Sequence, residues 1–140
     1  MRQILLTLTL WLAPAHAVLA IECLNGQSSD ILAIESWELR DGAGPDDERA
    51  IAITLELQGD LGIRLIDGTI RFEDVLGDRV AEFILERAEG IVPGQPYIHD
   101  EIIAGTVLER LEQLHPDDIA SIACVSALVY EDGTLQEFRQ

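Results

Sequence analysis

Hydrophobic and polar residues alternate along much of this chain. The clearest run covers residues 49–58, where isoleucine and leucine occupy every second position and smaller or polar residues lie between them. A period of two predicts a β-strand with one face buried and the other in water. The same alternation predicts further strands at residues 69–73 and 81–86.

Three other segments are predicted strands with less regular patterns. Residues 119–130 are apolar on both faces, which predicts a strand in the centre of a sheet. Residues 31–39 separate into two faces only if a bulge lies near Ser36. Residues 97–103 are a further candidate, in which Asp100 would share a face with two isoleucines.

Turn residues separate these runs. Residues 41–47 form a loop rich in glycine and aspartate, and Pro93-Gly94 marks a turn after the third strand. Residues 131–134, Glu-Asp-Gly-Thr, predict a hairpin, because Asp-Gly supplies the positive φ values of a type I′ turn. This hairpin would fold residues 135–138 back against the preceding strand.

One short helix is predicted between the last two long strands. Thr106 is the expected N-cap, Glu109 completes a capping box, and His115-Pro116 ends the helix. Four apolar residues share one of its faces: Val107, Leu108, Leu111 and Leu114. About seven short strands with regular turns and one short helix predict an all-β fold, an antiparallel immunoglobulin-like β-sandwich.

The first residues have the three-part layout of a secretory signal peptide. A positive start at Arg2 precedes an apolar run over residues 4–14 and the small-residue motif that ends at Ala17. The apolar run is about ten residues, shorter than the ~20 that a membrane-spanning helix needs. We therefore expect cleavage after Ala17, or alternatively after Ala20. Cleavage after Ala17 leaves residues 18–140 as a single domain. We expect this domain to be exported, either to the periplasm or out of the cell, and to be soluble.

Cys23 and Cys124 are the two cysteines of the chain. In an oxidising compartment an even pair in a small domain predicts a disulfide, here closing a loop of about 100 residues. The chain-entropy model assigns such a loop roughly 4–5 kcal/mol of stabilisation. A redox or metal-binding pair is the alternative, but the chain has no Cys-x-x-Cys spacing. Glu22 before Cys23 argues against a lipid attachment site, which requires a small residue there.

Composition narrows the possible partners. The 140 residues include 26 acidic residues and nine arginines but no lysine, giving a formal net charge of −17. This charge opposes binding to nucleic acid or to anionic membrane surfaces. The hydrophobic content of 48% is too high for a disordered acidic tail.

Several turn and strand motifs follow one another in a recognisable order. They are Asp-x-x-Gly at residues 74–77, the strand at 83–85, Pro93-Gly94 and the late segment 129–134. This order resembles the FxLYD-type and related immunoglobulin-like domains of bacterial extracytoplasmic proteins, over roughly residues 49–138. The resemblance implies a β-sandwich that is generally non-catalytic.

The loop after the first strand is the best candidate for a metal site. Asp41, Asp46, Asp47 and Glu48 offer hard oxygen ligands around a glycine-rich segment, which suits calcium. The spacing does not match an EF-hand, and a solvated acidic loop is the alternative interpretation. No cofactor is expected.

Catalytic patterns are sparse in the chain. No serine lies in a Gly-x-Ser-x-Gly turn, and His99 and His115 have no partner at ligand spacing. A pair of carboxylates for glycoside hydrolysis could come from any of the acidic residues. Trp37, the only tryptophan after the signal peptide, is expected to pack in the core or at a sheet edge rather than to stack on a ligand.

Three functional hypotheses follow. The first is an exported, non-catalytic binding or accessory module whose partner is another extracytoplasmic protein. The second is a calcium-binding structural module that uses the acidic loop at residues 41–48. The third is a small hydrolase with carboxylate chemistry.

Overall fold

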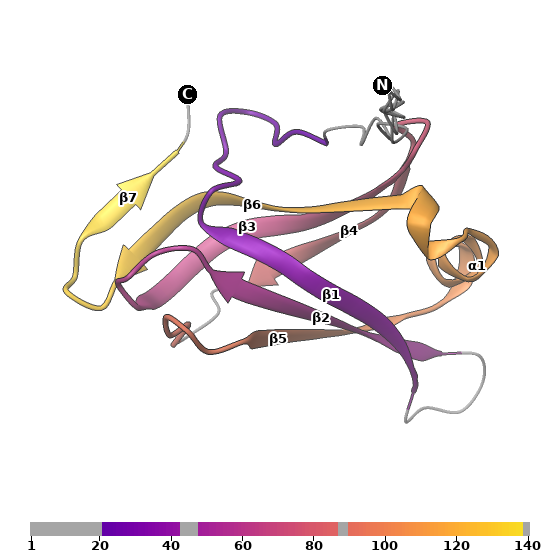
Figure 1. Cartoon of the computed structure of the whole chain (residues 1–140), viewed down its shortest axis with the longest axis horizontal. Helices are drawn as coiled ribbons and strands as arrows, with labels where there is room; N and C mark the ends of the chain where they lie inside the picture. Colours follow the sequence, from indigo (N-terminus) through magenta and orange to yellow (C-terminus); the bar gives the residue numbers. More distant parts are fainter. Residues whose placement is uncertain (1–20, 43–47, 87–89, 139–140) are drawn as a thin grey trace, which may run out of the picture.

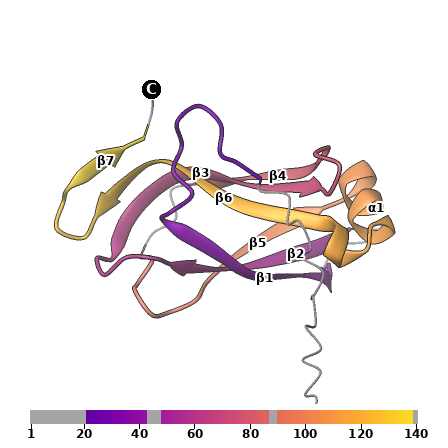
Figure 2. The ribbon, with the colours of Figure 1, turned by 45° about the horizontal axis from the view of Figure 1, so that its top comes forward.

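Two antiparallel sheets pack face to face in the computed structural model, which describes residues 21–42, 48–86 and 90–138 (Figure 1). A turn of the view by 45° shows the two layers and the helix at one end of them (Figure 2). The elements are β1 Leu32–Asp41, β2 Arg49–Leu57, β3 Ile63–Asp74, β4 Arg79–Glu86, β5 Tyr97–Ile103, α1 Gly105–Gln113, the 3-10 helix η1 Pro116–Asp118, β6 Ile119–Tyr130 and β7 Leu135–Glu137.

The strand order is that of an immunoglobulin-like sandwich. One sheet has the order β1-β2-β5 and the other β4-β3-β6-β7, and every neighbouring pair is antiparallel. Relative to the seven-stranded constant-type arrangement, β4 pairs with β3 rather than with β5. The predicted fold class is therefore confirmed: in the described ranges, seven strands form a β-sandwich with one short α-helix.

The core lies between the sheets and is built by the alternation seen in the sequence. Ile51, Ile53 and Leu55 of β2 are fully buried, as are Ile70 and Phe72 of β3. Because successive side chains of a strand point to opposite faces, this single pattern defines the inner layer of each sheet. Ring contacts tie the layers together: Phe72 meets Trp37 of β1 and Phe83 of β4 edge to face.

Most predicted strand limits are correct. The strands at 97–103 and 119–130 have the predicted bounds, and the register of β1 shifts between Ile34 and Ser36, at the predicted bulge. The first half of β3 was not predicted. Its register against β6 shifts twice, the second time between Asp67 and Gly68, and these shifts interrupt the alternation that would have identified it.

The ends of the helix and of the last hairpin differ from the predictions. Thr106 is not the N-cap: α1 begins at Gly105, where φ is +60°, and Ala104 is the N-cap without a side-chain hydrogen bond. The hairpin after β6 forms, but among its described residues only Gly133 has a positive φ. The turn is thus not type I′; a three-residue loop that ends in a left-handed glycine joins the strands.

None of the helices in the described ranges is long and apolar enough to cross a membrane. The predicted signal peptide, residues 1–17 or 1–20, lies outside these ranges.

Candidate functional site

A groove of about 840 Å³ opens between β1 and the segment formed by α1, η1 and the start of β6. β1 and β6 run close together near the start of β1 and diverge toward α1, which closes the wide end (Figure 1). The lining residues come from these elements and from the start of β2: Ile34, Glu35, Ser36, Trp37, Glu38, Leu39, Arg49, Leu111, Glu112, Leu114, Pro116 and Ser121.

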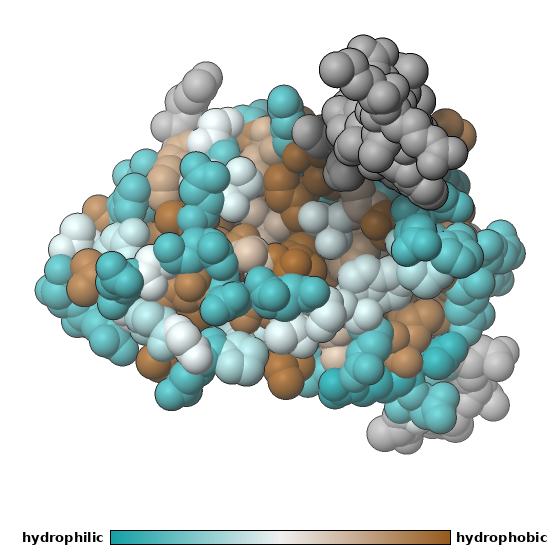
Figure 3. Space-filling model, viewed as in Figure 1, coloured by the Kyte–Doolittle hydropathy of each residue, from teal (hydrophilic) through white to brown (hydrophobic). Residues whose placement is uncertain are grey.

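The inner wall of the groove is apolar. Trp37 packs edge to face on Phe72, with ring centroids 5.6 Å apart, and still borders the groove with its remaining surface. Leu39 and Leu114 are half-buried beside it, and Leu111 is buried. Figure 3 shows hydrophobic side chains reaching the surface over β6 and β1, with hydrophilic side chains around them. Trp37 packs against the core as predicted, and part of its side chain also lines the groove.

The rim of the groove is acidic. Glu35, Glu38 and Glu112 are exposed, and two of these glutamates already form ion pairs with arginines. Arg49 lies 2.9 Å from Glu112, and Arg40 lies 2.5 Å from Glu38. The rim therefore carries more negative than positive charge, in keeping with the charge of the whole chain.

Arg110 anchors the helix that forms one wall of the groove. Its guanidinium donates a 2.6 Å hydrogen bond to Asp74, a buried carboxylate at the end of β3. Asp74 also accepts hydrogen bonds from the backbone N–H groups of Asp78 and Leu76. The bond from Asp78, with help from Arg110, lowers the pKa of Asp74 although burial opposes the shift. This wall is therefore held by a charge-assisted contact as well as by Leu108 and Leu111.

Both strands that flank the groove have an edge without a strand partner in the described ranges. β1 pairs with β2 alone and so forms the edge of its sheet. β7 has three residues and pairs only with Ala127–Val129 of β6. In the part of the chain that the structure describes, residues 119–124 of β6 therefore have β3 as their only strand neighbour. An unpaired edge exposes N–H and C=O groups that can bind another strand.

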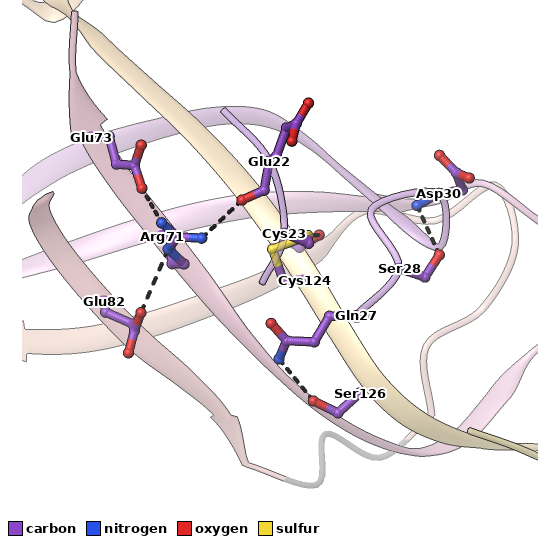
Figure 4. The surroundings of a disulfide bond; sticks show 11 residues. Glu22, Cys23, Gln27, Ser28, Asp30, Arg71, Glu73, Glu82, Cys124 and Ser126 are labelled. Carbon is purple, nitrogen blue, oxygen red and sulfur yellow. Dashed lines mark hydrogen bonds and ion pairs between the residues drawn. A yellow bond between two sulfur atoms is a disulfide. The ribbon is translucent and has the colours of Figure 1, made fainter. Parts of the chain in front are cut away.

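The predicted disulfide is confirmed. Cys23 and Cys124 are joined with an S–S distance of 2.04 Å, which ties the segment before β1 to the outer face of β6 (Figure 4). Arg71 reinforces this attachment by donating to the carbonyl oxygen of Glu22 at 2.9 Å while it pairs with Glu73. The described ranges contain no free cysteine.

The predicted calcium ligands are only partly described. Asp46 and Asp47 lie outside the described residues. Asp41 is fully exposed and 3.9 Å from Arg49, and Glu48 is exposed. In the described ranges no three histidine, cysteine, aspartate or glutamate residues form a group that could hold a metal ion. Calcium binding by this loop stays a prediction.

The contacts of the described residues include no serine–histidine pair for nucleophilic catalysis. His99 lies 3.5 Å from Glu101 and His115 lies 3.5 Å from Asp117, neither of them with a serine at hydrogen-bond distance among the contacts of the described residues. Instead, the Nδ1 atom of His115 accepts from the backbone of Asp117 and caps η1. The third hypothesis also stays a prediction.

The sequence did not predict the groove itself. Two signals pointed toward it: the bulge at Ser36 in an edge strand, and the shortness of the strand after Gly133. Neither signal says which elements face each other. Comparison of the chain with protein-family models, curated proteins and solved structures finds no match.

Proposed function

We propose that this chain is an exported, non-catalytic binding module that engages another extracytoplasmic protein through the groove between β1 and α1. The observation that carries this proposal is the groove: about 840 Å³ in volume, with an apolar wall around Trp37 and an acidic rim. Such a combination of an apolar centre and a charged rim is typical of protein-binding sites.

The disulfide and the sequence of the first 20 residues support the exported location. Disulfides form and persist in oxidising compartments, and a signal peptide delivers a chain there. The disulfide stabilises the N-terminal segment against β6, outside the groove, so it strengthens the scaffold without occupying the site.

An affinity capture with a groove-filling variant tests this function. Ser121 lines the groove and is half-buried, so Ser121→Tyr adds a ring there while the core side chains remain. Ser29→Tyr, at an exposed position that does not line the groove, is the matched control. Proteins captured from the extracytoplasmic fraction of the producing cells are compared among the wild type and both variants.

We expect at least one protein that the wild type and Ser29→Tyr retain and that Ser121→Tyr loses. Repeated capture with no such protein, from fractions in which all three forms are folded by circular dichroism, would contradict the proposal. A partner retained equally by Ser121→Tyr would move the binding site away from the groove.

A further inference from the structure

We infer that the groove binds an extended, positively charged segment of the partner protein, which adds to β1 as an additional strand. This inference rests on the proposed function and specifies the kind of partner and the way it binds. Strand addition to a free sheet edge uses backbone hydrogen bonds for affinity and side-chain pockets for specificity.

The first step of the argument is the way in which β1 lines the groove. Six consecutive residues of this strand, Ile34 to Leu39, border the groove. Because alternate side chains point to opposite faces of a sheet, a site on one face would be bordered by every second residue. A site bordered by consecutive residues lies along the edge of the strand, where backbone groups are available. Six residues of strand correspond to about 20 Å, enough for a short partner strand.

The short last strand explains why this edge is open. β7 pairs only with Ala127–Val129, the backbone N–H of Phe138 donates to the carbonyl oxygen of Ser126, and the bridge between Ser28 and Val125 follows along β6. From residue 119 to 124, β6 has no strand on that side among the described residues. A longer last strand would pass beside Ser121 and narrow the groove. The sandwich thus has room for one more strand on this side.

Charge decides which segment fits. Three exposed glutamates, Glu35, Glu38 and Glu112, lie at the rim. Arg40 is paired with Glu38 and Arg49 with Glu112, which leaves the rim with a net negative charge. An acidic rim on a chain with a net charge of −17 attracts cationic side chains and speeds their association. The apolar wall at Trp37 would contact the side chains on the opposite face of the partner strand. The expected partner strand therefore alternates arginine or lysine with apolar residues.

The same charges oppose a second copy of this chain as the occupant. Two β1 strands paired edge to edge would place Glu35 and Glu38 near their own counterparts, and like charges across a strand pair are destabilising. Charged residues and a bulge such as the one near Ser36 are common means by which edge strands avoid self-association.

A pair of synthetic peptides tests the inference. The probe is a capped ten-residue peptide that alternates arginine and valine. Its matched control has the same sequence with every backbone amide N-methylated, which preserves the side-chain charge and apolar surface but removes the donors on both edges of the peptide, so that neither edge can pair with β1. Both are titrated into the disulfide-bonded protein, with Trp37 fluorescence and calorimetry as readouts, and the titrations are repeated with Ser121→Tyr and Ser29→Tyr.

We expect the arginine-valine peptide to bind the wild type and Ser29→Tyr with an affinity that falls as salt is raised. N-methylation should weaken binding by about tenfold or more, because at least two backbone hydrogen bonds are lost. Ser121→Tyr should weaken it similarly. Hydrogen exchange should slow at amides of residues 34–39 when the peptide is bound.

Three results of the titrations would overturn the inference. They are no binding at millimolar peptide, equal binding of the N-methylated peptide, and equal binding by Ser121→Tyr. The affinity capture described above remains an independent readout: a partner lost by Ser121→Tyr, together with peptides that fail, would retain the proposed function and reject strand addition. Self-association of the free protein through β1 in sedimentation would make a second copy the occupant and would also reject the inference.

Discussion

Arg110 donates a 2.6 Å hydrogen bond to Asp74, which joins the helix to the C-terminal end of β3. This ion pair between distant parts of the chain supports the wall of the groove together with the buried Leu108 and Leu111. Asp74 accepts backbone hydrogen bonds from Asp78 and Leu76 as well. A carboxylate with three donors is stabilised in its ionised form, which is the reason that its pKa is lowered.

The pH dependence of stability should report this carboxylate. The pKa of Asp74 is lowered on folding from an ordinary value near 3.9, so its contribution is present above about pH 4 and is lost as pH falls through the lowered value. Asp74→Asn should therefore lower the melting temperature at pH 7, and the difference from the wild type should shrink below pH 4.

Thermal melts of both proteins from pH 7 to pH 2.5 measure this effect. Asp60→Asn, at an exposed position, is the control and should follow the wild type. A difference between Asp74→Asn and the wild type that stays constant down to the lowest pH would show that ionisation of Asp74 contributes nothing to it.

The disulfide should account for a large part of the stability. It joins residues 101 positions apart, and the chain-entropy model gives about 4–5 kcal/mol for such a loop. Replacing Cys23 and Cys124 together with serine should lower the free energy of unfolding in urea by an amount of that order. Thiol titration of the denatured, unreduced wild type should find no free thiol. Two free thiols would refute the bond.

Close packing of β3 against β6 should make Gly68 intolerant of any side chain. A Cβ atom at this position would lie 2.5 Å from the carbonyl oxygen of Cys124, a backbone atom that cannot rotate away. Gly68→Ala should destabilise the protein by about 1–3 kcal/mol. The matched control is Gly59→Ala, where nothing lies within 4 Å of the added atom. Equal urea midpoints for the two variants would contradict the register of β3 and β6.

If the acidic loop is a solvated surface loop, the alternative to a calcium site, calcium should leave the melting temperature unchanged. Among the predicted ligands of the acidic loop, Asp41 is exposed and lies 3.9 Å from Arg49, whose charge competes with a cation for it. A ligand that binds only the folded state raises the melting temperature, and the stabilisation grows with the logarithm of one plus the ratio of ligand concentration to dissociation constant. Melts with millimolar calcium and with a chelator compare the two interpretations. A clear rise with calcium would favour the calcium-binding module.

Local pattern was sufficient to predict most of the strands. The period of two in β2 and β4 and the turn residues that follow are local patterns, and a break in the alternation near Ser36 was enough to predict the bulge in β1. Prediction was wrong where longer-range contacts or backbone geometry decided the outcome. The start of β3 was missed because its irregular register depends on pairing with β6, and Thr106 lost the role of N-cap because the chain turns at Gly105.

By itself the sequence determined the sandwich class, the strand alternation, the acidic surface and the pairing of the two cysteines. The first two follow from the local periodicity, the acidic surface follows from the composition, and two cysteines can form only one disulfide within the chain. Only the tertiary structure decided that Trp37 of β1, Leu114 after α1 and Ser121 of β6 border one groove. These residues are brought together by the divergence of β1 from β6 and by the short β7. Both are properties of how whole sheets pack, which no local pattern encodes.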